Sequence, residues 1–377
     1  YGVRGEIELR ALSCHSGRLL WRRVVAFSLK RSLDDFARGW KFLGIFTVPK
    51  SLNESNWLRV NDSLKMFAEK EIKLVLLSAL HKDLRAALAR PDVCQKLGKR
   101  CGLFVGINRY KSRGLPRLSF AADDAAAFAR LVKPKDQPTA DRNLTLLVNN
   151  AATEEAVLAA LERIVARATP FDEVIVYFAG YGLTRPFKKK VPLPPEQKSP
   201  AERQKFRIEK VLRGFVLLYD SSPKGKNPGL AVDRLLETLS KCPAEKILVV
   251  IDCGFNSERS CRGASEEGLK GTPDMEQIKA FTSKKGRWVL FAGRYCLDGA
   301  AEFEHHKAGV LTGYFLAATR AVAESDTNRD GRLTLAEIFN YAAPRAVEET
   351  QMEACPQQPV LLGAGAENLI LWIRRKP

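Results

Sequence analysis

The chain has 377 residues, of which 45% are hydrophobic and 28% charged, the balance of a soluble globular protein. No apolar run approaches the roughly 18 residues that a membrane helix needs, so no membrane span is expected. The eight cysteines are scattered without a Cys-x-x-Cys pair, which argues against a disulfide framework or a cysteine zinc site. This usage favours a reducing, cytoplasmic compartment.

The net charge of +18 favours acidic partners: nucleic acid, an anionic membrane surface or an acidic protein. A simpler explanation is that the positive charge serves only to keep the protein soluble, because no Lys/Arg run is interleaved with stacking aromatic residues. The sequence begins at Tyr1 rather than at a methionine, and Tyr1–Arg10 lacks the apolar core of a signal peptide. The natural N-terminus is therefore expected to be missing, and a leader removed earlier stays an open alternative.

Residues 1–98 form a basic region that we cannot assign to a fold. Gly5–Leu9 and Gly17–Trp21 have the pattern of two strands joined by a turn. Apolar residues then recur at helical spacing from Ile72 to Leu88 and predict an amphipathic helix that ends near Pro91.

From residue 99 to 377 strands and helices alternate, which predicts an α/β domain with a mostly parallel sheet and helices on both faces. The expected strands are Cys101–Asn108, Leu144–Val148, Glu173–Ala179, Phe215–Tyr219, Ile247–Asp252 and Trp288–Ala292, and the expected helices are Ala121–Val132, a segment capped by Thr153 that ends near Ala168, Val232–Ser240 and Gly309–Ala323. Thr184–Arg213 holds five prolines and many basic residues without an apolar period, so we expect a long, exposed and mobile loop there.

The order of the strand-end motifs resembles the caspase/metacaspase family of cysteine peptidases, particularly bacterial caspase-like proteins. The motifs that carry the resemblance are Leu103-Phe-Val-Gly-Ile-Asn-Arg-Tyr110, Ala122-Asp-Asp-Ala125, Val174-Ile-Val-Tyr-Phe-Ala-Gly-Tyr-Gly182, Ile247-Leu-Val-Val-Ile-Asp252, Gly309-Val-Leu-Thr312 and Gln357-Gln-Pro359. The resemblance covers about three quarters of the chain, and six ordered matches make coincidence an unsatisfactory explanation. It implies the caspase-like fold.

In that family a His after Gly is the base and a Cys after Asp-Ala is the nucleophile. The resemblance places Tyr181 at the His position and, in the gapless register, Gly254 at the Cys position, with Gly182 at the oxyanion position. A phenol with an ordinary pKa near 10 is a poor base at pH 7, and glycine offers no nucleophile. The substitutions imply that the chain does not hydrolyse peptides by the family's mechanism.

Cys253, one residue before Gly254, is the fallback nucleophile. Side chains alternate between the two faces of a strand, so a shift of one residue turns this thiol away from the site. No histidine replaces the missing base by motif: His15 and His81 precede the domain, and His305 and His306 lie in a polar loop where we expect solvated side chains.

The segment 326–337 matches an EF-hand calcium loop, and bacterial caspase-like proteins often carry such a loop here. The expected ligands are Asp326, Asn328, Asp330, the carbonyl of Arg332, Thr334 (through water) and a bidentate Glu337, with Gly331 at the sharp turn. The alternative is a helix N-cap turn in which Asp and Asn only bond backbone N–H groups. Arg329 and Arg332 offset the carboxylates and no second loop is visible, so a weak structural calcium site is expected.

Three functions follow. The first is a pseudopeptidase, a caspase-like fold kept for binding or regulation, with a protein or peptide, such as an active relative, in the vacated cleft. The second is an active, calcium-dependent cysteine endopeptidase that uses Cys253. The third is a polyanion-binding module, formed by the basic N-terminal region and the segment Thr184–Arg213, with nucleic acid or another acidic partner.

Overall fold

The computed structural model describes residues 98–133, 143–192, 206–255, 271–352 and 356–373, together with the backbone of 2–12 and 19–30. The chain divides into two units, Tyr1–Leu97 and Gly98–Pro377, one residue from the boundary expected from the sequence. In the first unit, β1 (Gly2–Leu12) pairs antiparallel with β2 (Leu19–Lys30), so the predicted strand pair is present and longer than expected. The predicted helix that ends near Pro91 lies outside the described residues.

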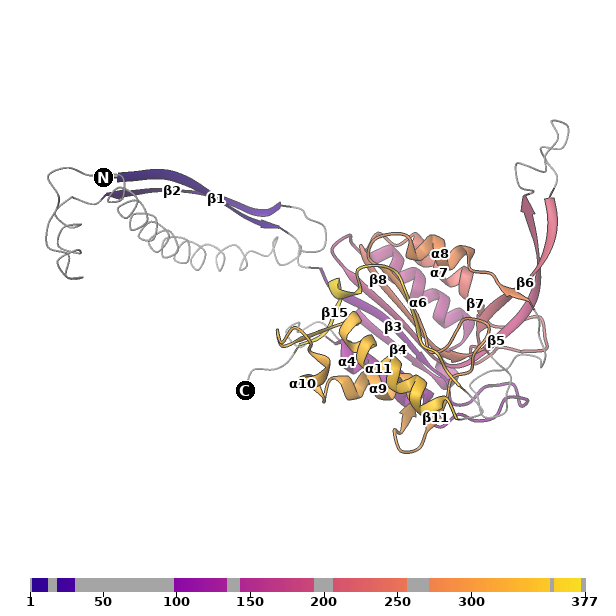
Figure 1. The fold of residues 1–377 in the computed structure, drawn as a ribbon. Helices are drawn as coiled ribbons and strands as arrows, with labels where there is room; N and C mark the ends of the chain where they lie inside the picture. Colours follow the sequence, from indigo (N-terminus) through magenta and orange to yellow (C-terminus); the bar gives the residue numbers. More distant parts are fainter. Residues whose placement is uncertain are drawn as a thin grey trace, which may run out of the picture. The chain divides into compact units, whose positions relative to one another are not determined.

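The second unit is built on one mixed sheet (Figure 1). Its main path runs β14-β10-β8-β5-β3-β4, and these strands are β3 (Arg100–Gly106), β4 (Leu144–Val148), β5 (Glu173–Pro192), β8 (Lys246–Gly254), β10 (Arg287–Phe291) and β14 (Val360–Leu362). All neighbours on this path are parallel except β14, which is antiparallel to β10. Read from β4 to β14 and numbered by position in the chain, these six strands have the order 2-1-3-4-5-6. The direction in which strands are added to the sheet therefore reverses between β3 and β5. In such sheets ligand groups gather beyond the carboxyl ends of the strands at that point.

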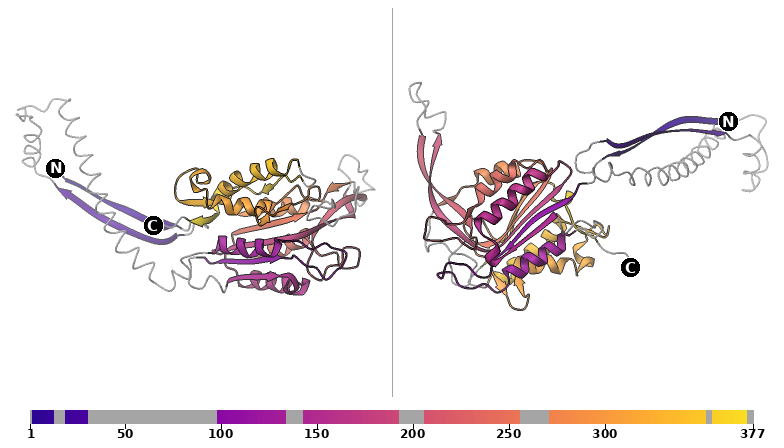
Figure 2. Two further views of the ribbon diagram at one scale, coloured as in Figure 1. Left: turned by 90° about the horizontal axis from the view of Figure 1, so that it is seen from below. Right: turned by 180° about the vertical axis from the view of Figure 1, so that it is seen from behind.

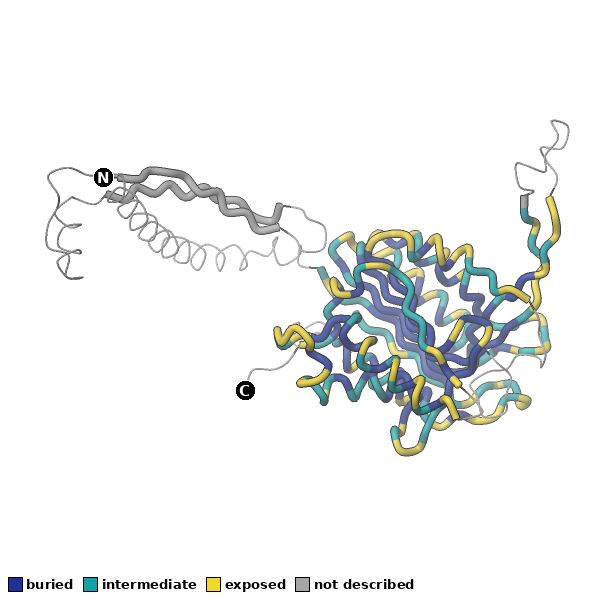
Figure 3. Tube along the Cα trace, viewed as in Figure 1, coloured by how far each residue is buried: buried dark blue, intermediate teal, exposed yellow. Residues whose placement is uncertain are grey.

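Helices cover both faces of the sheet, as Figure 2 shows, and the predicted α/β class is confirmed. One face carries α6 (Glu154–Arg167), α7 (Val232–Ser240) and α8 (Glu276–Thr282), and the other carries α4 (Ala121–Val132), α9 (Val310–Ala318) and α11 (Leu335–Thr350). The strands between them are buried on both sides, which explains why they are nearly continuous apolar runs (Figure 3). Thr153 caps α6 as predicted, accepting a hydrogen bond from the Ala156 N–H at 3.2 Å.

The prediction of a loop over Thr184–Arg213 is wrong for the residues that the structure describes. β5 continues through Pro192 and pairs antiparallel with β6 (Phe206–Val216), and residues 193–205 lie outside the described part. The outer part of the hairpin is exposed and rich in proline and lysine. Because it buries little apolar surface, its sequence lacks the alternating apolar pattern by which strands are predicted. The short strands β7 (Leu230–Ala231) and β9 (Thr272–Pro273) pair with β6.

The predicted helix Gly309–Ala323 is two helices, α9 and the short α10 (Val322–Ser325), while α11 runs through Thr350 and accommodates Pro344. Around them lie two small pairs, β11 (Glu302–Phe303) with β12 (Ala308–Gly309), and β13 (Arg332–Thr334) with β15 (Ile370–Ile373). Short 3-10 turns occur at Asn149–Ala151 and Ala366–Asn368. Among the described residues, no helix is long and apolar enough to cross a membrane.

Candidate functional site at the carboxyl ends of β5 and β8

Tyr181 and Gly254 lie side by side at the carboxyl ends of neighbouring parallel strands. The register pairs Gly180 with Cys253 and Tyr181 with Gly254. The ring of Tyr181 is only 5% exposed and packs beside Tyr110, which follows β3, with 5.6 Å between ring centroids. The Tyr110 hydroxyl also accepts a hydrogen bond of 2.8 Å from the Tyr181 N–H. The two tyrosines therefore meet at the point between β3 and β5 where the strand order reverses.

Aromatic packing fills the space behind these strand ends. Phe255 is 2% exposed and contacts Phe291 and Tyr295 edge to face, with ring centroids 6.3 and 5.2 Å away. The Tyr295 hydroxyl accepts a 2.8 Å hydrogen bond from the buried Gly214 N–H of β6. A Cβ at Gly182 would lie 2.5 Å from the Gly254 carbonyl oxygen, so the backbones approach too closely for any side chain. Gly182 itself pairs with Val216 within the hairpin ladder, where we had expected an oxyanion position.

Cys253 faces the other side of the sheet from Tyr181. Its side chain is 3% exposed and packs in the core beneath α6, α7 and α8, whereas Tyr181 packs in the core beneath α4, α9 and α11. The Cys253 thiol lies 3.8 Å from the Phe178 carbonyl oxygen, within hydrogen-bond reach for sulfur. The thiol is therefore held among apolar groups rather than presented at the strand ends.

A second thiol, Cys296, borders the same aromatic cluster. Burial raises its pKa from 9.0 to about 12, against the opposing effect of hydrogen bonds with Thr184 and Tyr295. Burial also raises the pKa of the neighbouring Tyr295 hydroxyl well above 10. Both groups stay protonated near neutral pH, which is the opposite of the thiolate that nucleophilic catalysis requires.

Three of the sequence motifs meet in a buried hydrogen-bonded triad that the sequence did not reveal. Asp252 ends its motif on β8, and its carboxyl accepts hydrogen bonds from the Thr312 hydroxyl at 2.7 Å and from the Tyr177 hydroxyl at 3.3 Å. The Tyr177 and Thr312 hydroxyl oxygens lie 2.7 Å apart. Tyr177 comes from β5 and Thr312 from α9, so the triad ties two strands to a helix. The only sequence signal for this triad is an Asp at the end of a buried apolar strand.

Other motif residues also make structural hydrogen bonds. Asp124 on α4 accepts the Gly309 N–H with both carboxylate oxygens, at 3.2 and 3.0 Å. Asn108 accepts the Ala122 N–H at 2.9 Å, which satisfies one donor at the start of α4. The motif residues thus join elements of the fold that are distant in sequence.

The segment 326–337, the EF-hand-like loop expected from the sequence, is a turn whose carboxylates accept backbone hydrogen bonds. Asp326 accepts the N–H groups of Asp330 and Gly331 at 3.1 and 2.9 Å, and Gly331 has φ 76°. Glu337 instead forms a capping box with Thr334 at the start of α11 and also accepts a hydrogen bond from the Thr327 N–H. Burial acts to raise the pKa of Glu337, but its hydrogen bonds from Thr334 and Thr327 outweigh this and lower it.

The remaining expected ligands surround this turn. Asn328 accepts the Asp330 N–H at 3.0 Å, and Arg332 lies on β13, which pairs with β15 rather than with a second calcium loop. Among the described residues, the carboxylate oxygens of Asp326, Asp330 and Glu337 do not all lie within 4.8 Å of one another. The oxygen donors suit a hard cation in kind, but Glu337 must leave its cap to join them.

His305 is exposed, as expected from the sequence, whereas His306 is largely covered. Both contact Glu349 near the end of α11, and His306 is only partly exposed. They lie on the turn between β11 and β12. This turn leads into α9, which packs on the opposite face of the sheet from Cys253.

No family model and no curated protein matches the chain. Among solved structures, the chain is similar to the Geobacter sulfurreducens protein GSU0716, with a TM-score of 0.45 and 16% identity over 74% of this chain and 100% of that one. It is also similar to caspase-1 from Spodoptera frugiperda, with a TM-score of 0.44 and 11% identity over 74% of this chain and 91% of that one. The α/β class rests on the strand order and register described above, since both scores are below 0.5.

Proposed function

We propose that this chain is a catalytically inactive caspase-like protein that acts by binding or regulating a protein or peptide partner, such as an active relative. The observation that carries the proposal is the register of β5 and β8. It sets Tyr181 beside Gly254 and turns Cys253 to the opposite face. A thiolate nucleophile needs an imidazole within hydrogen-bond reach, and both histidines of the described domain contact Glu349 instead.

The test is turnover of Arg- and Lys-containing peptide substrates by the purified chain, with and without calcium. We expect none above a buffer control. The variant Cys253→Ala addresses the competing proposal of a calcium-dependent endopeptidase. If the wild type cleaves these peptides and Cys253→Ala abolishes cleavage, the chain is an enzyme and our proposal is wrong. Cys296→Ala is the matched control, because it removes another buried thiol.

The proposal includes a weak calcium site at 326–337, supported by the loop's backbone hydrogen bonds and oxygen donors. Asp326, Asn328, Asp330 and Glu337 would hold the ion through side-chain oxygens, Thr334 through water and Arg332 through its carbonyl. Calcium would act there as a structural brace between α10 and α11. We expect calcium at millimolar concentration to raise the unfolding midpoint of the wild type but not of Asp326→Asn. Equal midpoints with and without calcium in the wild type would remove the site.

A second candidate function is binding of a polyanion such as nucleic acid, favoured by one face of the β5–β6 hairpin. Lys188, Lys190 and Lys210 lie on that face together with Phe206 and Ile208, and all five are exposed. Exposed lysines beside an aromatic ring suit a backbone of phosphates and its bases. Lys189 alternates to the other face, where it pairs with Asp274 and Glu276.

Retention on DNA or heparin that falls steeply with salt would support this function. We expect Lys188→Ala/Lys190→Ala/Lys210→Ala to elute at lower salt than the wild type. Lys241→Ala, at an exposed position after α7, is the control. Retention that is absent, or that the triple substitution leaves unchanged, would contradict a role for the hairpin.

A further inference from the structure

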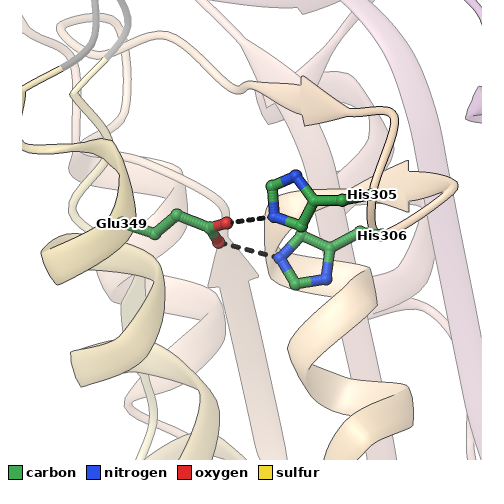
Figure 4. A group of neighbouring side chains, drawn as sticks. All are labelled: His305, His306 and Glu349. Carbon is green, nitrogen blue, oxygen red and sulfur yellow. Dashed lines mark hydrogen bonds and ion pairs between the residues drawn. The ribbon is translucent and has the colours of Figure 1, made fainter.

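Two imidazoles and a carboxylate converge at the side of the domain shown in Figure 4. His305 Nε2 lies 2.5 Å from Glu349 Oε1, and His306 Nε2 lies 2.8 Å from Glu349 Oε2. The ligand-type atoms of all three side chains lie within 4.8 Å of one another. In the part of the chain that the structure describes, this is the one such group of three His, Cys, Asp or Glu residues.

From this cluster we propose that His305, His306 and Glu349 form a binding site for a divalent transition metal ion of the zinc type. Two neutral imidazoles and one carboxylate are a ligand set typical of zinc sites with an open fourth position. Zinc bonds of about 2.0–2.2 Å at tetrahedral angles place ligand atoms about 3.4 Å apart, so the His–Glu separations need to widen by less than about 1 Å. The open position faces solvent, because the His305 side chain is 65% exposed.

His306 is held in place by α9. A Cβ at Gly313 would lie 3.1–3.3 Å from the His306 ring, so glycine there leaves the space into which the imidazole packs. The Tyr314 ring contacts the same imidazole edge to face, with centroids 5.0 Å apart. Such fixing of an imidazole by its surroundings is typical of ligands that are positioned before the metal arrives.

The Tyr314 hydroxyl also interacts electrostatically with Glu349. The nearby Arg345 is directed elsewhere: it bonds Glu324 at 3.0 Å and stacks on Tyr341. A cation therefore meets the carboxylate and both imidazoles without having to displace a guanidinium.

The position suggests what a bound ion does. The histidines lie on the turn between β11 and β12, and Glu349 lies in the last turn of α11, so coordination links this turn to α11. α11 begins at the EF-hand-like loop, but the two clusters share no residue. The zinc site is therefore independent of the calcium site and of the proposed pseudopeptidase function.

The experiment is zinc titration of the tag-free chain, stripped with chelator, in competition with a chromophoric indicator. We expect one site in the wild type that is lost in His305→Ala/His306→Ala. Tyr314→Phe keeps all three ligands but removes the hydroxyl that interacts with Glu349, and we expect it to weaken binding about 10- to 100-fold. Glu349→Gln, which keeps the size of the side chain, is expected to weaken binding more. The control is His15→Ala/His81→Ala, which removes the same number of imidazoles elsewhere.

Two further readouts separate the site from thiols and from misfolding. Cobalt bound at this site gives visible bands without thiolate charge transfer, since no sulfur coordinates it. Zinc raises the unfolding midpoint of the wild type and of Asp326→Asn, but not that of His305→Ala/His306→Ala. Zinc affinity and midpoint shift that are the same in the wild type and in His305→Ala/His306→Ala would overturn the proposal. Equal loss of affinity in the His15/His81 control, or cobalt spectra dominated by thiolate, would do so as well.

Discussion

The buried triad Tyr177–Asp252–Thr312 and the aromatic cluster around Phe255 come together at the end of β8, yet they relate to the sequence motifs in opposite ways. In the triad, residues of three motifs bond one another in the core. At the strand ends just beyond, Tyr181 and Gly254 stand where the sequence resemblance predicts a base and a nucleophile, and aromatic rings pack behind them.

The difference shows that the motifs support the fold and the chemistry separately. A buried hydroxyl or carboxyl without a partner costs roughly 1–3 kcal/mol, so the hydrogen bonds of the triad stabilise the fold of this chain. A base or a nucleophile serves chemistry rather than folding, whereas packed apolar groups at the same place would stabilise the domain. Each prediction below changes one side of this comparison.

The largest effect is expected in the reactivity of Cys296. A pKa of about 12 in place of 9.0 leaves about a thousandfold less thiolate near neutral pH. We expect alkylation of Cys296 in the folded chain to be slower by at least this factor than in guanidinium-unfolded chain, as measured by mass spectrometry of the peptide. Because the folded chain favours the protonated thiol, its contribution to stability is complete below about pH 9 and is lost as the pH rises toward 12. Fast labelling at pH 7 would mean that the strand ends form a reactive site.

The next largest effect is expected when a ring of the aromatic cluster is truncated, which should lower the stability of the domain. Phe255→Ala removes a ring that is packed on Phe291 and Tyr295, and we expect it to lower the free energy of unfolding by about 3–5 kcal/mol in urea denaturation. Phe206→Ala, on the exposed part of the hairpin, is the control and should change it by less than about 0.5 kcal/mol. A small loss for Phe255→Ala would indicate an open cleft rather than a packed core.

Removal of the carboxyl group from the triad is expected to lower the free energy of unfolding by about 2–3 kcal/mol. Asp252→Ala leaves the Tyr177 and Thr312 hydroxyls without their shared acceptor inside the sheet. Asp123→Ala, an exposed acid in the first turn of α4, serves as the control and should cost less than about 1 kcal/mol. Equal effects of the two substitutions would contradict a structural role for the triad.

The sequence predicted the parallel sheet and its helices because buried strands and capped helices leave local patterns, as in Ile247–Asp252 and at Thr153. It also placed Tyr181 and Gly254 just beyond two expected strands, Glu173–Ala179 and Ile247–Asp252, at the sheet edge where the ends of parallel strands meet. It did not predict the hairpin beyond Thr184, whose exposed face has no apolar period, nor the His305–His306–Glu349 cluster. That cluster joins residues more than 40 positions apart across a turn and a helix end, and only the packing of α11 brings them together.

The smallest loss of stability is expected from a change at Tyr110, which packs beside Tyr181. Tyr110 follows β3 and bonds the Tyr181 N–H, at the reversal of strand order where other doubly wound sheets bind ligands. Tyr110→Phe keeps the ring contact with Tyr181 and removes only the hydroxyl, so we expect a loss of about 1 kcal/mol in thermal or urea unfolding. Tyr219→Phe is a matched removal of a hydroxyl from a partly exposed ring and tests for general effects of the substitution. A loss for Tyr110→Phe no greater than for Tyr219→Phe would mean that this hydrogen bond does not fix the end of β5. Tyr181 would then be held in place by its packing alone.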